Sequence, residues 1–294
     1  MLAIAVDSGC APTVEMMKKY NPFFIGMKII IDDKEFTDSV EFRDSKFYDI
    51  IKKAKDFKTA QPPLGMLLEF YNSVKEAGYD ELVDIHFSSK LSGLYSTAIM
   101  AAEMVKGIKV HVVDTMQISI TAGLVTRRIM EMLIDEKRPV EDVMKLVPAI
   151  RNNSFMQFNI PTMEYLVKNG RIGHATALAG KLLNIKPILT VDSEGFLSPS
   201  NKLRGMKKVF NQMADNIVEF FKTHPYKKRL YIIYGFKEYK SYMEKTLNLI
   251  QKKASDVGIE GLDDIMIGRI WPTVACHSGP SVFGVSCYGE ETEI

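Results

Sequence analysis

Cysteine is scarce in this chain of 294 residues. Only Cys10, Cys276 and Cys287 occur, and no two of them form a C-x-x-C pair. An odd and scattered set of three does not match the framework of a disulfide-rich domain or of a zinc knuckle. This cysteine usage is typical of a reducing compartment and predicts a cytoplasmic location.

The sequence also lacks an excess of charge and a long apolar run. The formal net charge is +2, and the basic residues alternate with acidic ones, so no nucleic-acid-binding stripe or polybasic membrane anchor stands out. The apolar run Leu2–Val6 ends at Asp7, and no later run approaches the length of a membrane span. We expect a soluble protein without an integral membrane segment, for which transient membrane contact stays open.

Several motifs of known chemistry are missing. Neither G-x-G-x-x-G nor G-x-x-x-x-G-K-[ST] occurs, and the segment 284–289 does not have the glycine spacing of G-x-S-x-G. Asp84 with His86, and His111 with Asp114, offer two ligands each, whereas a zinc site needs three or four. We therefore expect no metal and no nucleotide cofactor.

The first half of the chain alternates short apolar runs with segments of helical periodicity. Such alternation predicts an α/β domain with a parallel sheet and helices on both faces, where ligands bind beyond the carboxyl ends of the strands. Polar residues at the expected loops or helix entries are Asp7, Ser8, Thr59, Ser88 to Gly93 and Asp114. The expected strands cover 2–6, 25–31, 82–87 and 108–113, and the expected helices 12–20, 46–55, 64–77, 94–106, 119–136 and 139–152.

Beyond residue 154 the pattern changes. Residues 182–191, a turn at 192–195 and Phe196-Leu197 indicate a hairpin, and long helices at 204–223 and 237–254 separate further strands. This pattern predicts an α+β domain with a mainly antiparallel sheet. The expected domains are therefore 1–154 and 155–294.

The segment Ser88–Ala98 joins a strand to a helix through hydroxyls and a glycine. Because the first amides of a helix lack intrahelical partners, Ser92 Oγ and the amides of Gly93 and Leu94 are candidates for binding a carboxylate or phosphate. Plain N-capping by Ser92 explains the same pattern, and both interpretations stay open at this point.

Two arginines are candidate ligands of an anion, and one histidine stands out by its loop. His277 lies in a predicted loop held by Gly279 and Pro280, while Arg171 and Arg204 each adjoin a glycine at a helix boundary. The alternatives are a turn histidine, pairing of Arg171 with a helix C-terminus, and a solvated helix entry for Arg204.

A series of short motifs, ordered along nearly the whole chain, resembles the DegV family of bacterial fatty-acid-binding proteins, which serve as acyl carriers for a fatty-acid kinase. The ordered combination is far more specific than any single motif. The motifs are Asp7-Ser8, Thr59-Ala60-Gln61-Pro62, Ser88-Ser89-x-Leu91-Ser92-Gly93, Val113-Asp114, Gly170-Arg171-Ile172, Leu182 to Leu189, Arg204-Gly205 and His277-x-Gly279-Pro280.

The resemblance implies a two-domain protein that buries a long-chain fatty acid of the C14–C18 class. It assigns the carboxylate to Thr59, Ser92, Gly93 and His277, and the second domain would complete the acyl pocket. Arg171 and Arg204 would contact the head group or the partner kinase. The chain itself would be a carrier, without a cofactor or a catalytic motif of its own. We expect Thr59, Ser92 and His277 to converge although they lie far apart in sequence.

The chain departs from the family pattern at four positions: Ala60, Leu94, Trp271 and Ser281 replace the usual serine, threonine and two glycines. Ala60 and Leu94 remove hydroxyls near the head group, and Trp271 is expected to narrow or cover the acyl tunnel.

One alternative function is a lipid hydrolase that uses Ser92 and His277, or a phosphoryl-transfer enzyme that uses His277 and the arginines. Another is a module that senses a small anion at the Ser92 turn.

Overall fold

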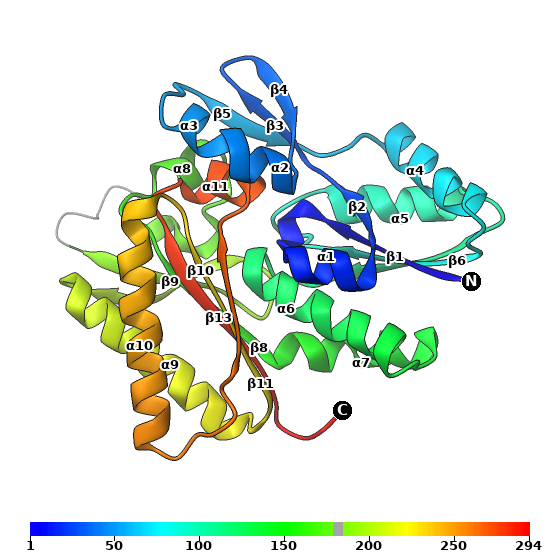
Figure 1. Cartoon of the computed structure of the whole chain (residues 1–294). Coiled ribbons are helices and arrows are strands. Elements are labelled where there is room, and N and C mark those ends of the chain that lie inside the picture. Colours follow the sequence, from blue (N-terminus) through cyan, green and yellow to red (C-terminus); the bar gives the residue numbers. More distant parts are fainter. Residues whose placement is uncertain (179–184) are drawn as a thin grey trace. The chain divides into compact units, whose positions relative to one another are not determined.

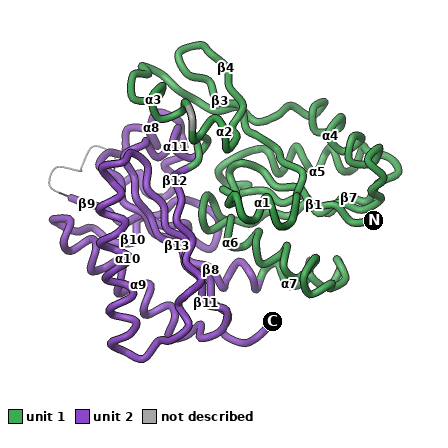
Figure 2. The backbone as a smooth tube through the Cα atoms, in the orientation of Figure 1, with its two compact units in different colours: residues 1–148, 271–273 green, residues 149–270, 274–294 purple. Residues whose placement is uncertain are grey.

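A computed structural model describes residues 1–178 and 185–294 of the chain (Figure 1). The chain divides into two compact units, which Figure 2 shows in different colours. Unit 1 comprises Met1–Pro148 and Trp271–Thr273, and unit 2 comprises Ala149–Ile270 and Val274–Ile294. The predicted two-domain organisation is confirmed, and the first change of unit falls inside helix α7 (Val140–Asn152).

Unit 1 contains the predicted parallel sheet. Its strand order is β2-β1-β6-β7, with every neighbouring pair parallel. The central strands are buried on both faces, as their continuous apolar runs require. Figure 1 shows helices α4 and α5 on one side of these strands and α6 on the other. The bounds are β1 Leu2–Asp7, β2 Phe23–Ile25, β6 Glu81–His86, β7 Lys109–Asp114, α1 Val14–Tyr20, α4 Leu64–Glu76, α5 Leu94–Met104 and α6 Ser119–Met130.

A second sheet in unit 1 was not predicted. Strands β3 (Lys28–Ile31), β4 (Lys34–Thr37) and β5 (Phe57–Ala60) pair antiparallel in the order β4-β3-β5. The predicted single strand 25–31 is therefore wrong, because the chain leaves the parallel sheet at Ile25 and enters the second sheet at Lys28. Gly26 permits this change, since a Cβ there would lie 2.5 Å from the Asp38 carbonyl oxygen.

The predicted helix over 46–55 starts earlier and is irregular. The chain forms one short α-helix, a π-helical turn and a second short α-helix, which ends at Ile51. Ser39 caps the first of these helices by accepting a hydrogen bond from the Phe42 amide at 3.1 Å. The bounds are α2 Val40–Phe42, the π-turn Arg43–Phe47 and α3 Tyr48–Ile51.

Unit 2 contains the predicted, mainly antiparallel sheet, with strand order β10-β9-β8-β13-β11-β12. All described neighbours pair antiparallel except β11 and β12, which run parallel. Helices α9 and α10 pack their apolar faces on this sheet, and Phe210, Met213 and Ile250 are buried there with Ile232 and Phe283 of the strands. The bounds are β8 Ser154–Asn159, β9 Lys186–Val191, β10 Leu197–Leu203, β11 Tyr226–Tyr234, β12 Asp264–Arg269, β13 Phe283–Glu290, α8 Glu164–Lys168, α9 Met206–Thr223, α10 Lys240–Asp256 and α11 Pro272–Ser278.

The predicted hairpin of unit 2 is present where the structure describes it. β9 and β10 pair antiparallel around a turn that begins at Asp192. Residues 182–184 of the predicted strand lie outside the described residues. Among the described helices, none combines the length and the apolar character that crossing a bilayer requires.

Candidate functional site

The turn between β6 and α5 carries Ser92 and Gly93. The amides of Leu91 and Ser92 donate to the Ser88 carbonyl oxygen at 3.0 and 3.2 Å, which closes the turn. Helix α5 begins at Leu94, whose amide donates to Ser92 Oγ at 3.1 Å. The N-cap residue of α5 is Gly93 and not Ser92, and Ser92 Oγ binds the Leu94 amide from the position before it. We expected this amide to be a candidate for binding an anion, but its hydrogen bond to Ser92 occupies it. The exposed Gly93 amide donates to no other group in the part of the chain that the structure describes.

The sequence predicted Thr59 at the entry to a helix. The structure places it in the edge strand β5, where it is paired with Ile29. Helix α4 follows only at Leu64. The next residues of the same motif reach the Ser92 turn, because Gln61 Nε2 donates to Thr97 Oγ1 of α5 at 2.7 Å. A Cβ at Gly93 would lie 2.8 Å from Gln61 Oε1, so this packing depends on glycine. The structure thus places the Thr59–Gln61 segment beside the first turn of α5.

A buried chain of charged groups lies next to this turn. His86, the last residue of β6, is bonded through Nδ1 to Asp7 Oδ2 and through Nε2 to Asp84 Oδ2, each at 2.9 Å. Tyr71 Oη of α4 donates to the same Asp84 oxygen at 2.6 Å. The Asp7 carboxylate also accepts hydrogen bonds from the amides of Cys10 and Phe87, at 3.1 and 3.2 Å. The chain of bonds ties β1, β6 and α4 together directly before the Ser88–Gly93 turn.

The charge of His86 follows from its two partners. Burial alone lowers the pKa of the imidazole, but the carboxylates of Asp84 and Asp7 outweigh it and raise the pKa to about 10. His86 is therefore an imidazolium at neutral pH. The sequence placed Asp84 and His86 on one strand face, yet gave no sign that Asp7 joins them from a neighbouring strand.

A second buried group in unit 1 involves the short segment Trp271–Thr273. The amide and hydroxyl of Thr273 both donate to Asp38 Oδ2, and Thr273 Oγ1 lies 3.1 Å from Ser8 Oγ. Burial raises the pKa of Asp38 to about 7, against the lowering effect of the Thr273 and Ser8 hydrogen bonds. Trp271 is 1% exposed, with its ring 5.7 Å from that of Phe24 and the Arg43 guanidinium 5.0 Å above it.

His277 lies in the last turn of helix α11, so the predicted loop around it is wrong. Gly279, with φ of +78°, follows the helix, and a Cβ there would lie 2.5 Å from the Tyr165 ring. Burial, and secondarily the charge of Arg171, lower the pKa of His277 to about 4. The imidazole is therefore neutral at pH 7 and offers one N–H donor.

The two arginines differ in their surroundings. Arg171 is exposed and donates through Nη1 to the Asn169 carbonyl oxygen at 2.7 Å, while Asn169 Nδ2 donates to the Cys276 carbonyl oxygen of α11 at 3.1 Å. These bonds link the Arg171 turn to the helix that carries His277. Arg204 is exposed and directly precedes Gly205, the N-cap residue of α9.

The predicted site residues thus fall into two groups. Thr59, Ser92 and Gly93 belong to unit 1, whereas His277, Arg171 and Arg204 belong to unit 2. The contacts of each group are therefore known only within its own unit, and the convergence of Ser92 with His277 stays a prediction.

The comparisons with known proteins agree on one family. The DegV family model matches residues 1–290. A DegV domain-containing protein of Clostridium acetobutylicum is 30% identical over 286 residues, which cover 97% of each chain. This chain therefore belongs to the DegV family.

Solved structures give the same result for the fold. A fatty-acid-binding DegV family protein from Thermus thermophilus matches with a TM-score of 0.85 and 25% identity, over 98% of this chain and 99% of the other. A DegV lipid-binding protein from Thermotoga maritima matches with a TM-score of 0.84 and 28% identity, over 99% of each chain. The predicted fold class, a parallel-sheet α/β domain with a mainly antiparallel α+β domain, is confirmed.

Proposed function

We propose that this protein binds one long-chain fatty acid, of the C14–C18 class, and presents its carboxylate to a separate fatty-acid kinase. Membership of the DegV family and two relatives described as binding a fatty acid or a lipid support the ligand class. The observation that carries the site is the packing of Gln61 against Gly93 and Thr97, which brings the Thr59 segment to the first turn of α5.

The carboxylate in this proposal is bound by uncharged donors. Thr59 and Ser92 supply hydroxyls, the Gly93 amide points out of a helix N-terminus, and the neutral His277 supplies a further N–H. A carboxylate that leaves water needs such hydrogen bonds, because its desolvation costs several kcal/mol. The acyl chain contributes about 0.8 kcal/mol for each buried methylene, so the tail supplies most of the affinity.

The proposal makes the protein a carrier in the cytoplasm and not an enzyme by itself. Within unit 1, Ser92 Oγ accepts a hydrogen bond from the Leu94 amide, which leaves its hydroxyl proton to donate to a bound carboxylate. Cys10, Cys276 and Cys287 are buried thiols that are not joined in disulfides, in agreement with a reducing location.

Native mass spectrometry of protein purified from cells tests the ligand class. We expect one C14–C18 acid per chain, retained without turnover. Ser92→Ala should weaken binding of added fatty acid by about 10-fold to 100-fold, since a hydrogen bond to a charged group contributes about 1.5–3 kcal/mol. Ser96→Ala, at an exposed hydroxyl of the same helix turn, is the matched control and should bind as the wild type does.

Two outcomes would count against the carrier. Ester hydrolysis that Ser92→Ala abolishes would establish the hydrolase instead, and a bound phosphate without lipid would establish the small-anion module.

The kinase step is tested by a separate assay with a fatty-acid kinase and ATP. In this assay Arg171→Ala should slow formation of acyl phosphate while the fatty-acid content of the protein is unchanged.

A further inference from the structure

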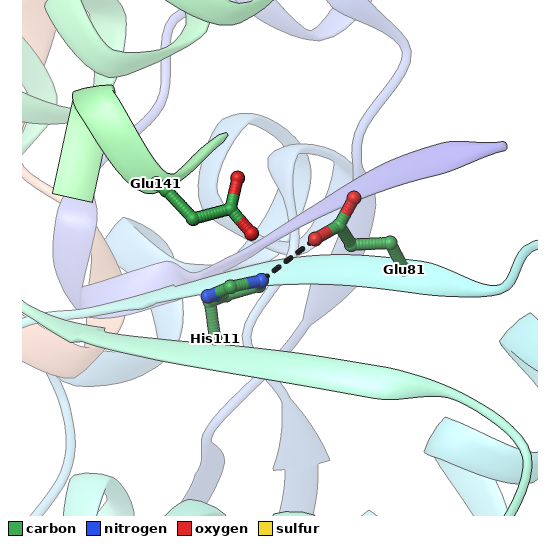
Figure 3. A group of neighbouring side chains, drawn as sticks. All are labelled: Glu81, His111 and Glu141. Carbon is green, nitrogen blue, oxygen red and sulfur yellow. Dashed lines mark hydrogen bonds and ion pairs between the residues drawn. The ribbon is translucent and has the colours of Figure 1, made fainter. Parts of the chain in front are cut away.

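A group of three potential metal ligands lies in unit 1 at the amino-terminal end of β6. Glu81 begins β6, His111 lies in the adjacent strand β7, and Glu141 lies in the first turn of α7. Each residue offers one ligand atom, and these atoms all lie within 4.8 Å of one another. Figure 3 shows the three side chains directed toward one common space, with His111 Nε2 2.8 Å from Glu81 Oε1.

The sheet register places two of the ligands side by side. Glu81 is paired with Lys109, and Val83 is paired with His111. Since side chains two residues apart project from the same face of a strand, Glu81, Lys109 and His111 all share one face. Glu141 reaches the same face from α7, so three separate elements supply the ligands.

The group already holds a cation, the ammonium of Lys109. Its Nζ lies 2.7 Å from Glu141 Oε1 and 3.5 Å from Glu81 Oε1. The Lys109 side chain is 58% exposed and has solvent to move into, whereas His111 is only 15% exposed and stays in place.

We propose that Glu81, His111 and Glu141 bind a divalent transition-metal ion of the Zn²⁺ type, which displaces the Lys109 ammonium. One imidazole and two carboxylates, with water in the remaining position, form a ligand set that suits Zn²⁺. Mg²⁺ and Ca²⁺ prefer an all-oxygen shell and are poorly matched by the imidazole. The ion would fasten the first turn of α7 to the edge strand β7 of the parallel sheet.

Titration of the metal-free full chain with ZnCl₂ by isothermal calorimetry tests the site. We expect one Zn²⁺ per chain and a rise in melting temperature on binding, with no displacement by excess MgCl₂. Replacing an outer partner of a metal ligand costs about 10-fold to 100-fold in metal affinity, so His111→Ala should cost at least as much. Lys109→Ala should tighten binding several-fold, because the competing cation is gone.

Two further variants guard the interpretation. Glu141→Gln changes only an exposed side chain, so its expected loss of affinity does not depend on any effect on folding. His174→Ala is the matched control: His174 is an exposed histidine with a single carboxylate partner, Asp192 at 2.9 Å, and its loss should leave Zn²⁺ affinity unchanged.

The proposal is overturned if the chain binds no Zn²⁺, if His111→Ala and Glu141→Gln bind it as the wild type does, or if Lys109→Ala weakens binding. Absorption of the Co²⁺-substituted protein gives a second readout, since the bands of a four-coordinate site should disappear in His111→Ala. None of these results depends on fatty-acid binding, so the site and the carrier function stand or fall separately.

Discussion

The two ends of strand β6 hold the same types of side chain in different surroundings. At the carboxyl end, His86 lies between Asp7 and Asp84, and all three side chains are fully buried. At the amino-terminal end, His111 lies beside Glu81 and near Glu141, whose side chain is 60% exposed.

Burial gives the two groups different properties. The buried carboxylates have no water to screen them, and they keep His86 protonated at neutral pH. At the other end, Glu81 is half-buried and Glu141 exposed, and both carboxylates are paired with the exposed ammonium of Lys109. A histidine with two carboxylates is therefore a structural element in the first case and an exchangeable cation site in the second.

The largest expected effect comes from breaking the buried group. His86→Ala leaves Asp7 and Asp84 buried without their cation, and loss of one partner from a buried ion pair costs about 3–5 kcal/mol. Urea unfolding at pH 7 should show this loss in the free energy of unfolding. A cost below about 1 kcal/mol would mean that the group does not stabilise unit 1. His86→Gln, which keeps a polar side chain there, serves if the alanine variant does not fold.

The pH dependence of stability sharpens the comparison. The pKa of His86 rises from 6.5 to about 10 on folding, so the folded state binds the proton more tightly than the unfolded state. The stabilisation is complete below pH 6.5 and is lost as the pH rises toward about 10, by an amount on the order of a few kcal/mol. Unfolding curves from pH 6 to 10 should show wild type and His86→Gln approaching each other; parallel curves would contradict a raised pKa.

The smallest effect is expected at the exposed group. In metal-free protein, His111→Ala should lower the free energy of unfolding by about 1 kcal/mol or less, because the Glu81 and Glu141 carboxylates that it leaves reach solvent and keep Lys109 as a partner. Urea unfolding under the conditions used for His86→Ala gives the direct contrast. Equal losses at both histidines would refute the explanation by burial.

Elements with a clear apolar run could be predicted from the sequence. The run Leu2–Val6 and the helical spacing from Leu94 onward gave β1 and α5 almost to the residue. The second sheet was missed because its short strands have little apolar periodicity, and because nothing local shows that Gly26 redirects the chain. For α11, Pro272 in the first helical position was an available signal, which the nearby Gly279-Pro280 obscured.

The site was predictable in its residue types but not in its contacts. The order of the family motifs along the chain singled out Thr59 and Ser92. The hydrogen bond from Gln61 to Thr97 could not be predicted, because Gln61 follows a strand of the antiparallel sheet and Thr97 lies in the helix after a strand of the parallel sheet. The Glu81, His111 and Glu141 group was out of reach, because it depends on strand register and on the position of α7. The sequence pointed to His111 alone, and paired it with Asp114 instead of Glu81 or Glu141.

The return of Trp271–Thr273 to unit 1 has a consequence for synthesis on the ribosome. Ser8 and Asp38 emerge early, but their partner Thr273 follows them in the chain by 265 and 235 residues. Until then Asp38 lacks the two hydrogen bonds that Thr273 donates, so the amino-terminal part of unit 1 is incompletely closed while residues 149–270 are made. Synthesis of Thr273, and not completion of residues 1–148, is the event that lets unit 1 reach its final state.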